Sequence, residues 1–148
     1  MKIIIYNSKT GFALKYAKWL GEDLNIEVKS LKEIKKVNLK DYDQVIFSTS
    51  IFANMLRGYK KLSKKTNNII VLAVGYTPMD GDYAEQLKAQ NNVKELFYVR
   101  GGINYEKLGF MSRALIKKVT NEPVSIDQSN KDYLNQIKEF LLEKNNEL

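Results

Sequence analysis

Short apolar runs that alternate with segments of helical periodicity constrain the fold of this chain more than any other feature. The runs are rich in β-branched residues and occupy residues 3–6, 45–47, 69–74 and 96–99, and a weaker run, interrupted by Glu27, occupies residues 26–28. Short runs that are apolar throughout are typical of strands buried on both faces. Strands joined through helices form a parallel sheet covered on both sides. We therefore predict an α/β three-layer sandwich around a five-stranded parallel sheet.

Helical periodicity marks the segments between these runs. In the first segment, apolar residues recur at spacings of three and four and so share one helix face: Leu14, Ala17, Leu20 and Leu24. The same pattern predicts helices over residues 59–65, 81–90, 109–119 and 130–144. A chain of 148 residues with 44% hydrophobic residues suits one core, so we predict a single domain over residues 1–148.

The amino-acid composition limits the chemistry that the side chains can perform. The sequence contains no cysteine and no histidine. This removes the thiolate nucleophile, the sulfur metal ligand and the commonest general base. Hydrolase triads and zinc sites are thereby excluded, and we predict no metal site and no catalytic side chain. Any reaction would have to come from a bound cofactor.

Charge indicates the kind of partner. Lysine and arginine outnumber aspartate and glutamate by 24 to 17, which gives a net charge of +7 and favours an anionic partner. Nucleic acid is not expected, because the lysines of residues 29–36 and 60–65 are not interleaved with exposed aromatic side chains. The sequence starts on a strand-like run and has no apolar run of membrane-spanning length, so we expect a cytoplasmic protein. The weaker hypothesis is peripheral binding to an anionic membrane surface at its inner face through Arg113, Lys117 and Lys118.

A loop of small and polar residues joins the first predicted strand to the first predicted helix. Its members are Ser8, Lys9, Thr10, Gly11, Phe12 and Ala13. Such a loop offers hydroxyls and unpaired amides at the positive end of a helix, where a phosphate is favourably bound. The glycine spacings of triphosphate and dinucleotide loops are absent, which favours a single phosphate. An ordinary strand-to-helix turn with a Ser or Thr cap is the alternative.

Two further loops follow the third and fourth predicted strands. The first contains a hydroxyl, apolar side chains and an asparagine: Ser50, Ile51, Phe52, Ala53 and Asn54. It could contact a polar chain and cover an aromatic ring, or its apolar members could simply pack under the sheet edge. The second contains Gly75, Tyr76 and Thr77, where glycine permits close approach and tyrosine offers a stacking surface. Glycine and proline after a strand also commonly do no more than turn the chain.

The loop at residues 8–13 resembles the phosphate loop of flavodoxins, [ST]-x-T-G-x-T, through Ser8, Thr10 and Gly11, and departs from it at Ala13. Together the three loops resemble the FMN-binding loops of flavodoxin-like proteins in order and spacing. The resemblance implies a flavodoxin-like fold with bound FMN and redox chemistry. It also implies that the backbone near Ala53 and Asn54 turns beside flavin N5.

The C-terminal part is similar to the flavodoxin-type protoporphyrinogen dehydrogenase group. Residues 97–108 and the basic segment 111–118 carry this similarity, which implies further cofactor contacts at Gly102 and Asn104. It also implies protoporphyrinogen as reductant and a quinone as acceptor. We therefore expect an FMN-binding oxidoreductase, with a protoporphyrinogen- or quinone-linked dehydrogenase as the narrower hypothesis. An electron-transfer protein that serves a redox partner protein, and a cofactor-free binding module, are the open alternatives.

Overall fold

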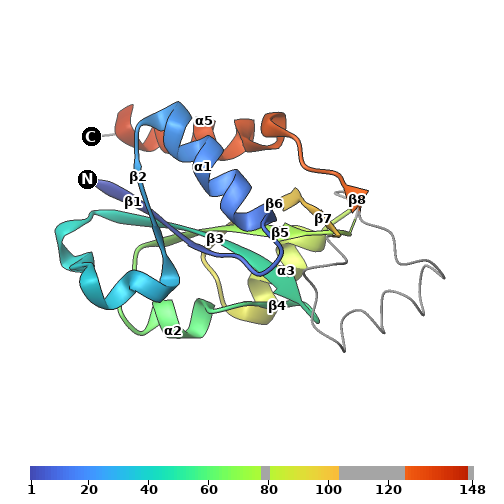
Figure 1. Ribbon diagram of the computed structural model, residues 1–148, viewed down its shortest axis with the longest axis horizontal. Helices are drawn as coiled ribbons and strands as arrows, with labels where there is room; N and C mark the ends of the chain where they lie inside the picture. Colours follow the sequence, from blue (N-terminus) through green and yellow to red (C-terminus); the bar gives the residue numbers. More distant parts are fainter. Residues whose placement is uncertain (78–80, 104–125, 147–148) are drawn as a thin grey trace.

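The computed structural model describes residues 1–77, 81–103 and 126–146 (Figure 1). Its main sheet has the strand order β2-β1-β3-β5-β6, and these five strands are parallel. Their bounds are β1 Lys2–Asn7, β2 Glu27–Ser30, β3 Gln44–Phe52, β5 Ile69–Gly75 and β6 Glu95–Arg100. All five predicted strands are confirmed, and so is the α/β fold with a parallel sheet between helices.

Helices cover both faces of the sheet. In Figure 1, α1 (Phe12–Leu24) and α5 (Asn135–Asn146) lie on one side, and α2 (Tyr59–Ser63) and α3 (Tyr83–Asn91) lie on the other. Strand side chains alternate between the two resulting cores. Ile4 packs with α1 and α5, whereas Ile3 and Ile5 pack against the opposite face. The predicted helix at residues 109–119 lies outside the described residues.

Three features of the fold differ from the sequence-based expectation. The crossover from β2 to β3 consists of two 3-10 helices, Leu31–Lys36 and Leu39–Asp41, each begun by a side-chain cap from Ser30 or Asn38. The C-terminal helix begins with a 3-10 turn, Lys131–Leu134, before α5. On α1 the buried residues are centred on Tyr16 and Leu20, and Leu14 is only half-buried.

Two short strand pairs extend the sheet system beyond the predicted strands. β4 (Met55–Leu56) folds back antiparallel on the end of β3, and β7 (Gly102–Ile103) pairs antiparallel with β8 (Ile126–Asp127). Figure 1 shows β7, β8 and the start of α1 at one end of the molecule, and the two termini at the opposite end. The carboxyl ends of the parallel strands therefore face the β7–β8 pair.

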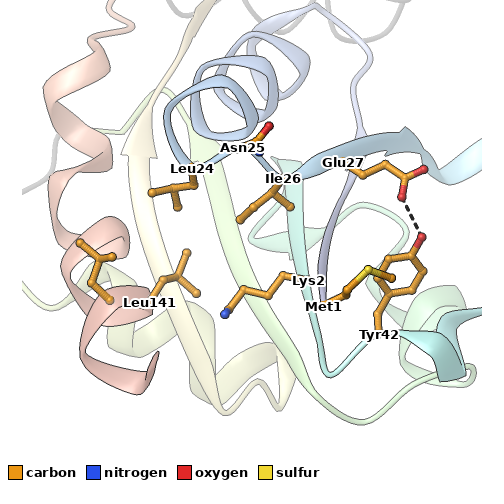
Figure 2. A pocket seen from close by; sticks show the side chains of 9 residues that line it. Met1, Lys2, Leu24, Asn25, Ile26, Glu27, Tyr42 and Leu141 are labelled. Carbon is orange, nitrogen blue, oxygen red and sulfur yellow. Dashed lines mark hydrogen bonds between the residues drawn. The ribbon is translucent and has the colours of Figure 1, made fainter. Parts of the chain in front are cut away.

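A pocket of about 440 Å³ opens at the opposite edge, beside the amino ends of the strands (Figure 2). Its lining is mainly apolar and includes Met1, Leu24, Ile26 and Leu142. At its rim the Tyr42 hydroxyl donates a 2.7 Å hydrogen bond to Glu27. No sequence motif indicated this pocket, because its lining comes from four segments that are far apart in the chain.

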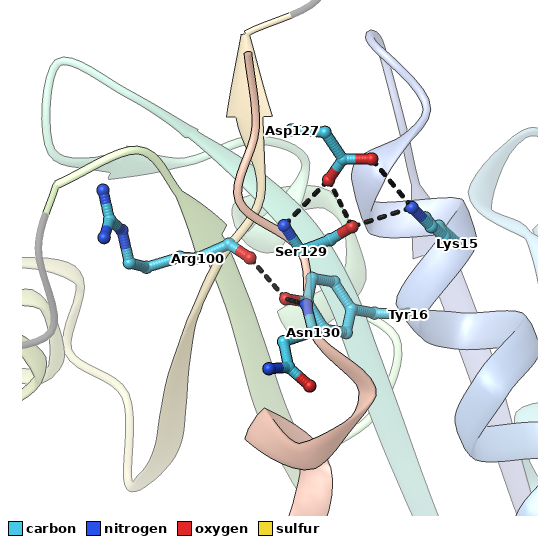
Figure 3. Close-up of polar contacts among 6 residues, drawn as sticks. All are labelled: Lys15, Tyr16, Arg100, Asp127, Ser129 and Asn130. Carbon is cyan, nitrogen blue, oxygen red and sulfur yellow. Dashed lines mark hydrogen bonds and ion pairs between the residues drawn. The ribbon is translucent and has the colours of Figure 1, made fainter.

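The Tyr16 hydroxyl connects α1 to two distant segments. It donates to the carbonyl of Arg100 at the end of β6 and accepts a 3.1 Å hydrogen bond from the Asn130 amide (Figure 3). Burial raises the pKa of this phenol to about 12. The contact fixes the point where β6 turns into β7, next to the predicted site.

We expect Tyr16→Phe to lower the free energy of unfolding at pH 7 by about 1–3 kcal/mol, because a buried carbonyl and an amide lose their partner. The raised pKa means that the folded state prefers the protonated phenol. The contribution of the Tyr16 hydroxyl to stability is complete below the ordinary tyrosine pKa and is lost as the pH rises towards about 12. Urea unfolding across this range should therefore show a smaller alkaline loss in Tyr16→Phe than in the wild type. Tyr76→Phe, at an exposed tyrosine, is the control. Identical pH profiles for all three proteins would contradict the assignment.

Candidate functional site

The three predicted loops begin at neighbouring strand ends on the carboxyl edge of the sheet. The parallel register places Asn7 of β1 beside Thr49 of β3, and Ser50 of β3 beside Val74 of β5. Adjacent strands lie roughly 4.8 Å apart. The fold thus brings the residues predicted at 8–13, 50–54 and 75–77 to one edge, where ligands bind in open parallel sheets.

The loop between β1 and α1 leaves backbone amides unpaired. Gly11 adopts a left-handed conformation (φ 101°) just before the helix, and its amide donates a 3.0 Å hydrogen bond to Ser8 Oγ. Within the described part of the chain, the amides of Thr10, Phe12 and Ala13 find no acceptor. These donors lie at the positive end of α1, so the loop has the features that bind a phosphate.

Buried hydroxyls hold the surroundings of this loop. Ser48 Oγ donates a 2.7 Å hydrogen bond to the Ala13 carbonyl, which fixes the first turn of α1 on β3. Thr49 Oγ1 and Asn7 Nδ2 both donate to the Arg57 carbonyl, at 2.5 and 3.0 Å. The loop between β1 and α1 and the segment that follows β4 are therefore positioned by the same pair of strands.

The loop expected after the third strand is a tight hairpin. β3 runs on to Phe52, and only Ala53 and Asn54 form the turn, with φ angles of 50° and 62°. Asparagine tolerates this left-handed conformation better than other non-glycine residues, which suits Asn54. Alanine rarely adopts the same conformation, and at Ala53 the strain costs roughly 1–2 kcal/mol.

Side chains of α3 hold this hairpin turn in place. The Tyr83 hydroxyl donates a 3.0 Å hydrogen bond to Asn54 Oδ1, and Asn91 Nδ2 donates to the Asn54 carbonyl at 2.9 Å. Asn91 Oδ1 also accepts from the Leu56 amide at 3.0 Å. Sequence reasoning missed Tyr83 and Asn91, since both lie in a helix with no recognisable motif.

The loop after β5 is linked to the hairpin through two tyrosines. The Tyr98 hydroxyl donates a 2.5 Å hydrogen bond to the Thr77 carbonyl, and burial raises the pKa of this phenol. The Tyr98 ring meets the edge of the Tyr83 ring at a centroid distance of 5.0 Å. Gly75 allows this packing, because a Cβ there would lie 3.0 Å from the Tyr98 ring. Tyr76 itself is exposed, which leaves its ring available for stacking.

One hydroxyl at this edge is buried without a partner. Ser50 Oγ, at the end of β3, makes no hydrogen bond with any described residue. An unpaired buried hydroxyl is unfavourable by about 1–3 kcal/mol. A polar ligand or a water molecule at the strand ends would remove that penalty, so Ser50 is a candidate ligand-binding residue.

The β7–β8 pair packs against the loop between β1 and α1. A Cβ at Gly102 would lie 2.0 Å from the Ile126 carbonyl oxygen and 2.9 Å from the Phe12 ring, so only glycine fits. Thr10, Gly11, Phe12 and residues of the strand pair line a pocket of about 340 Å³. Gly102 is thus brought to the predicted site, whereas Asn104 lies outside the described residues.

A polar cluster lies at the lining of this pocket. The Lys15 ammonium pairs with Asp127 at 3.0 Å and donates to Ser129 Oγ at 2.8 Å (Figure 3). Hydrogen bonds from Ser129 are the main cause of the lowered pKa of Asp127, and Lys15 adds to it. Lys15 is therefore neutralised by a carboxylate, while Lys9 is exposed on the loop itself.

The described residues contain neither a cluster of metal ligands nor a helix of membrane-spanning character. No cluster of three or more acidic side chains that could hold a metal ion occurs in residues 1–77, 81–103 and 126–146. In the same part of the chain, no helix is long and apolar enough to cross a membrane.

Solved structures with a similar fold include candidate flavoproteins of two Bacteroides species. That of Bacteroides uniformis ATCC 8492 is 13% identical, covers 82% of this chain and 97% of its own, and has a TM-score of 0.51. That of Bacteroides eggerthii DSM 20697 is 14% identical, covers 82% and 98%, and has a TM-score of 0.50. At such low identity these similarities show the fold alone. None of the curated proteins matches the chain.

A family model gives the more specific comparison. The model described as the flavodoxin domain matches residues 3–132, which is most of the sequence and includes all three loops at the carboxyl edge. The resemblance inferred from the loop motifs is thereby confirmed at the level of the family. The chain belongs to the flavodoxin domain family.

Proposed function

We propose that the protein binds FMN at the carboxyl edge of the sheet and acts in oxidation and reduction. The observation that carries this proposal is the set of unpaired amides at Thr10, Phe12 and Ala13, at the start of α1, in a member of the flavodoxin domain family. A monophosphate would satisfy these donors and interact favourably with the helix dipole.

The neighbouring loops supply groups suited to the rest of the cofactor. Ser50 offers an unpaired hydroxyl for a polar chain, and the exposed rings of Phe52 and Tyr76 offer apolar surface for an aromatic ring system. The hydrogen bonds of Tyr83 and Tyr98 would keep the two ring-bearing loops in place.

When bound, FMN would supply the ability to accept and release electrons. The chain has neither histidine nor cysteine, so its own contribution would be binding, orientation and the local electrostatic environment. The hairpin turn at Ala53 and Asn54 is the backbone element that we expect beside the reactive edge of the ring.

We expect Thr10→Ala to weaken FMN binding about ten- to hundredfold. The substitution removes the Thr10 hydroxyl, and a hydrogen bond from such a group to a charged phosphate contributes about 1.5–3 kcal/mol. Fluorescence titration of the apoprotein with FMN measures this directly. Thr66→Ala, in the loop between α2 and β5, is the matched control and should bind within about twofold of the wild type. An equal affinity in Thr10→Ala and Thr66→Ala would refute the placement of the phosphate. A wild-type protein that binds no FMN would refute the proposal.

Asn54→Val tests the role of the hairpin turn. Valine disfavours the left-handed conformation at φ 62° and cannot accept the Tyr83 hydrogen bond. We expect the one-electron potentials to shift by about 30–60 mV, while FMN affinity stays within about tenfold. Asn25→Val is the matched control, since Asn25 is also left-handed (φ 54°) but lies at the opposite edge of the sheet. Potentials that are unchanged, or that shift equally in both variants, would contradict the placement.

A protoporphyrinogen- or quinone-linked dehydrogenase remains the narrower hypothesis. This hypothesis rests on residues 97–108 and 111–118, of which only residues 97–103 lie in the described part of the chain. Turnover of protoporphyrinogen with a quinone would support it, whereas electron exchange without substrate turnover would favour an electron-transfer protein. A purified protein that neither is yellow nor takes up FMN would favour the cofactor-free binding module.

A further inference from the structure

Lysines without ion-pair partners collect on one side of the sheet. They lie on the two 3-10 helices between β2 and β3, on α2 and on the turn that follows α2. Within residues 1–77, 81–103 and 126–146 none of these lysines takes part in an ion pair, and all of their side chains are exposed. We call them the lysine face: Lys32, Lys35, Lys36, Lys40, Lys60, Lys61, Lys64 and Lys65.

The two lysine-bearing segments form one surface because they share a core. Leu31 and Ile34 of the first 3-10 helix are buried in the same core as Leu62 of α2. Their contact is close, since a Cβ at Gly58, the residue before α2, would lie 2.6 Å from Leu31 Cδ2. Figure 1 shows the 3-10 helices, in cyan, together with α2 on the side of the sheet opposite α1 and α5. The apolar residues thus hold both segments on the sheet and leave the lysines in solvent.

The lysine face carries most of the net charge of the protein. Its two segments, residues 31–41 and 59–66, contain eight lysines and only two acidic residues, Glu33 and Asp41. The net charge of the whole chain is +7. Positive charge is therefore concentrated on one side of the molecule, where it produces a local field that attracts anions.

We propose that the lysine face binds the surface of an anionic lipid bilayer. Each lysine close to such a surface strengthens binding about fivefold at low salt. The ammonium groups lie at the ends of long, flexible side chains, so they can reach lipid phosphates while the backbone stays outside the bilayer.

This surface is separate from the residues discussed so far. The lysine face shares no residue with the loops at 8–13, 50–54 and 75–77, so its binding does not depend on the proposed cofactor. Arg113, Lys117 and Lys118, for which the sequence suggested membrane contact, lie outside the described residues and carry no part of the proposal.

The composition of the lysine face disfavours a protein partner. Protein interfaces are built around buried aromatic or arginine side chains, and lysine is depleted in them. The two segments of the lysine face contain no arginine. None of the large apolar side chains that are clearly exposed in the described part of the chain belongs to them; these are Met1, Phe52, Met55, Tyr76 and Leu142.

Nucleic acid is also a less suitable partner for this surface. Single strands stack on exposed aromatic rings, and specific duplex binding commonly uses arginine or a helix placed in a groove. The 3-10 helices and α2 have only six, three and five residues, and within these described segments no exposed aromatic ring lies among the lysines. A lipid surface requires none of these features, because lysines contact its charges individually.

Sedimentation with lipid vesicles tests the proposal. Vesicles of phosphatidylcholine with about 30% phosphatidylglycerol should bind the protein at about 50 mM salt and release most of it at about 500 mM. Vesicles of phosphatidylcholine alone should bind little of it. The double variant Lys36→Gln/Lys61→Gln removes two charges from the lysine face and should weaken binding about ten- to thirtyfold.

The matched control removes the same charge from elsewhere. Lys18→Gln/Lys94→Gln replaces two exposed lysines, one on α1 and one just before β6, and should weaken binding less than about threefold. Because the two double variants have equal net charge, the difference between them reports where the charge lies. Equal weakening in both variants would contradict a localised surface.

Two further outcomes would overturn the proposal. Binding that is as strong to uncharged vesicles, or that persists at high salt, would rule out attraction to anionic lipid. Duplex DNA added at an equal concentration of phosphate groups should leave the protein on the vesicles, and transfer to the DNA would identify nucleic acid as the partner instead. Uptake of FMN has no bearing on these results, so failure of either proposal leaves the other standing.

Discussion

Burial of β1 and β3 on both faces is the constraint on which the site depends. Residues 3–5 and 45–47 are all fully buried, with side chains that alternate between the two cores. A shift of either strand by one residue would exchange every side chain between the cores, so the register is strongly specified. The fixed register sets where each strand ends. The three loops therefore meet at one edge without needing contacts to a ligand.

Hydroxyl groups then fix the loops and strand ends at this edge of the sheet. Four hydroxyls donate to backbone carbonyls around the edge: Ser48 to Ala13, Thr49 to Arg57, Tyr98 to Thr77 and Tyr16 to Arg100. Each of these bonds fixes one loop or strand end. Because the strands concerned are neighbours in the sheet, the fixed loops and strand ends lie side by side. Ser50 stands apart, because its buried hydroxyl has no partner within the described residues. The four bonded hydroxyls therefore hold the edge together, whereas the Ser50 hydroxyl is available to a ligand.

Sequence reasoning predicted the elements whose signals are local. β-Branched runs located all five parallel strands, and the motif of Ser8, Thr10 and Gly11 located the loop before α1. The hairpin was not predicted, because Ala53 and Asn54 lack the glycine that usually marks such turns. The β7–β8 pair joins residues that are distant in the chain, so no local pattern indicates it. Arg57, Tyr83 and Arg100 gain their roles only through neighbours that the fold brings to them.

The central claim is that the unpaired amides at the start of α1, together with the two neighbouring loops, form one cofactor site. Its most direct test is to follow the backbone amides of the isotopically labelled protein by NMR while FMN is added. We expect the largest changes at residues 9–13, 50–54 and 75–77, and little change around the pocket lined by Met1 and Leu142. Changes centred on that pocket, or none at saturating FMN, would contradict it.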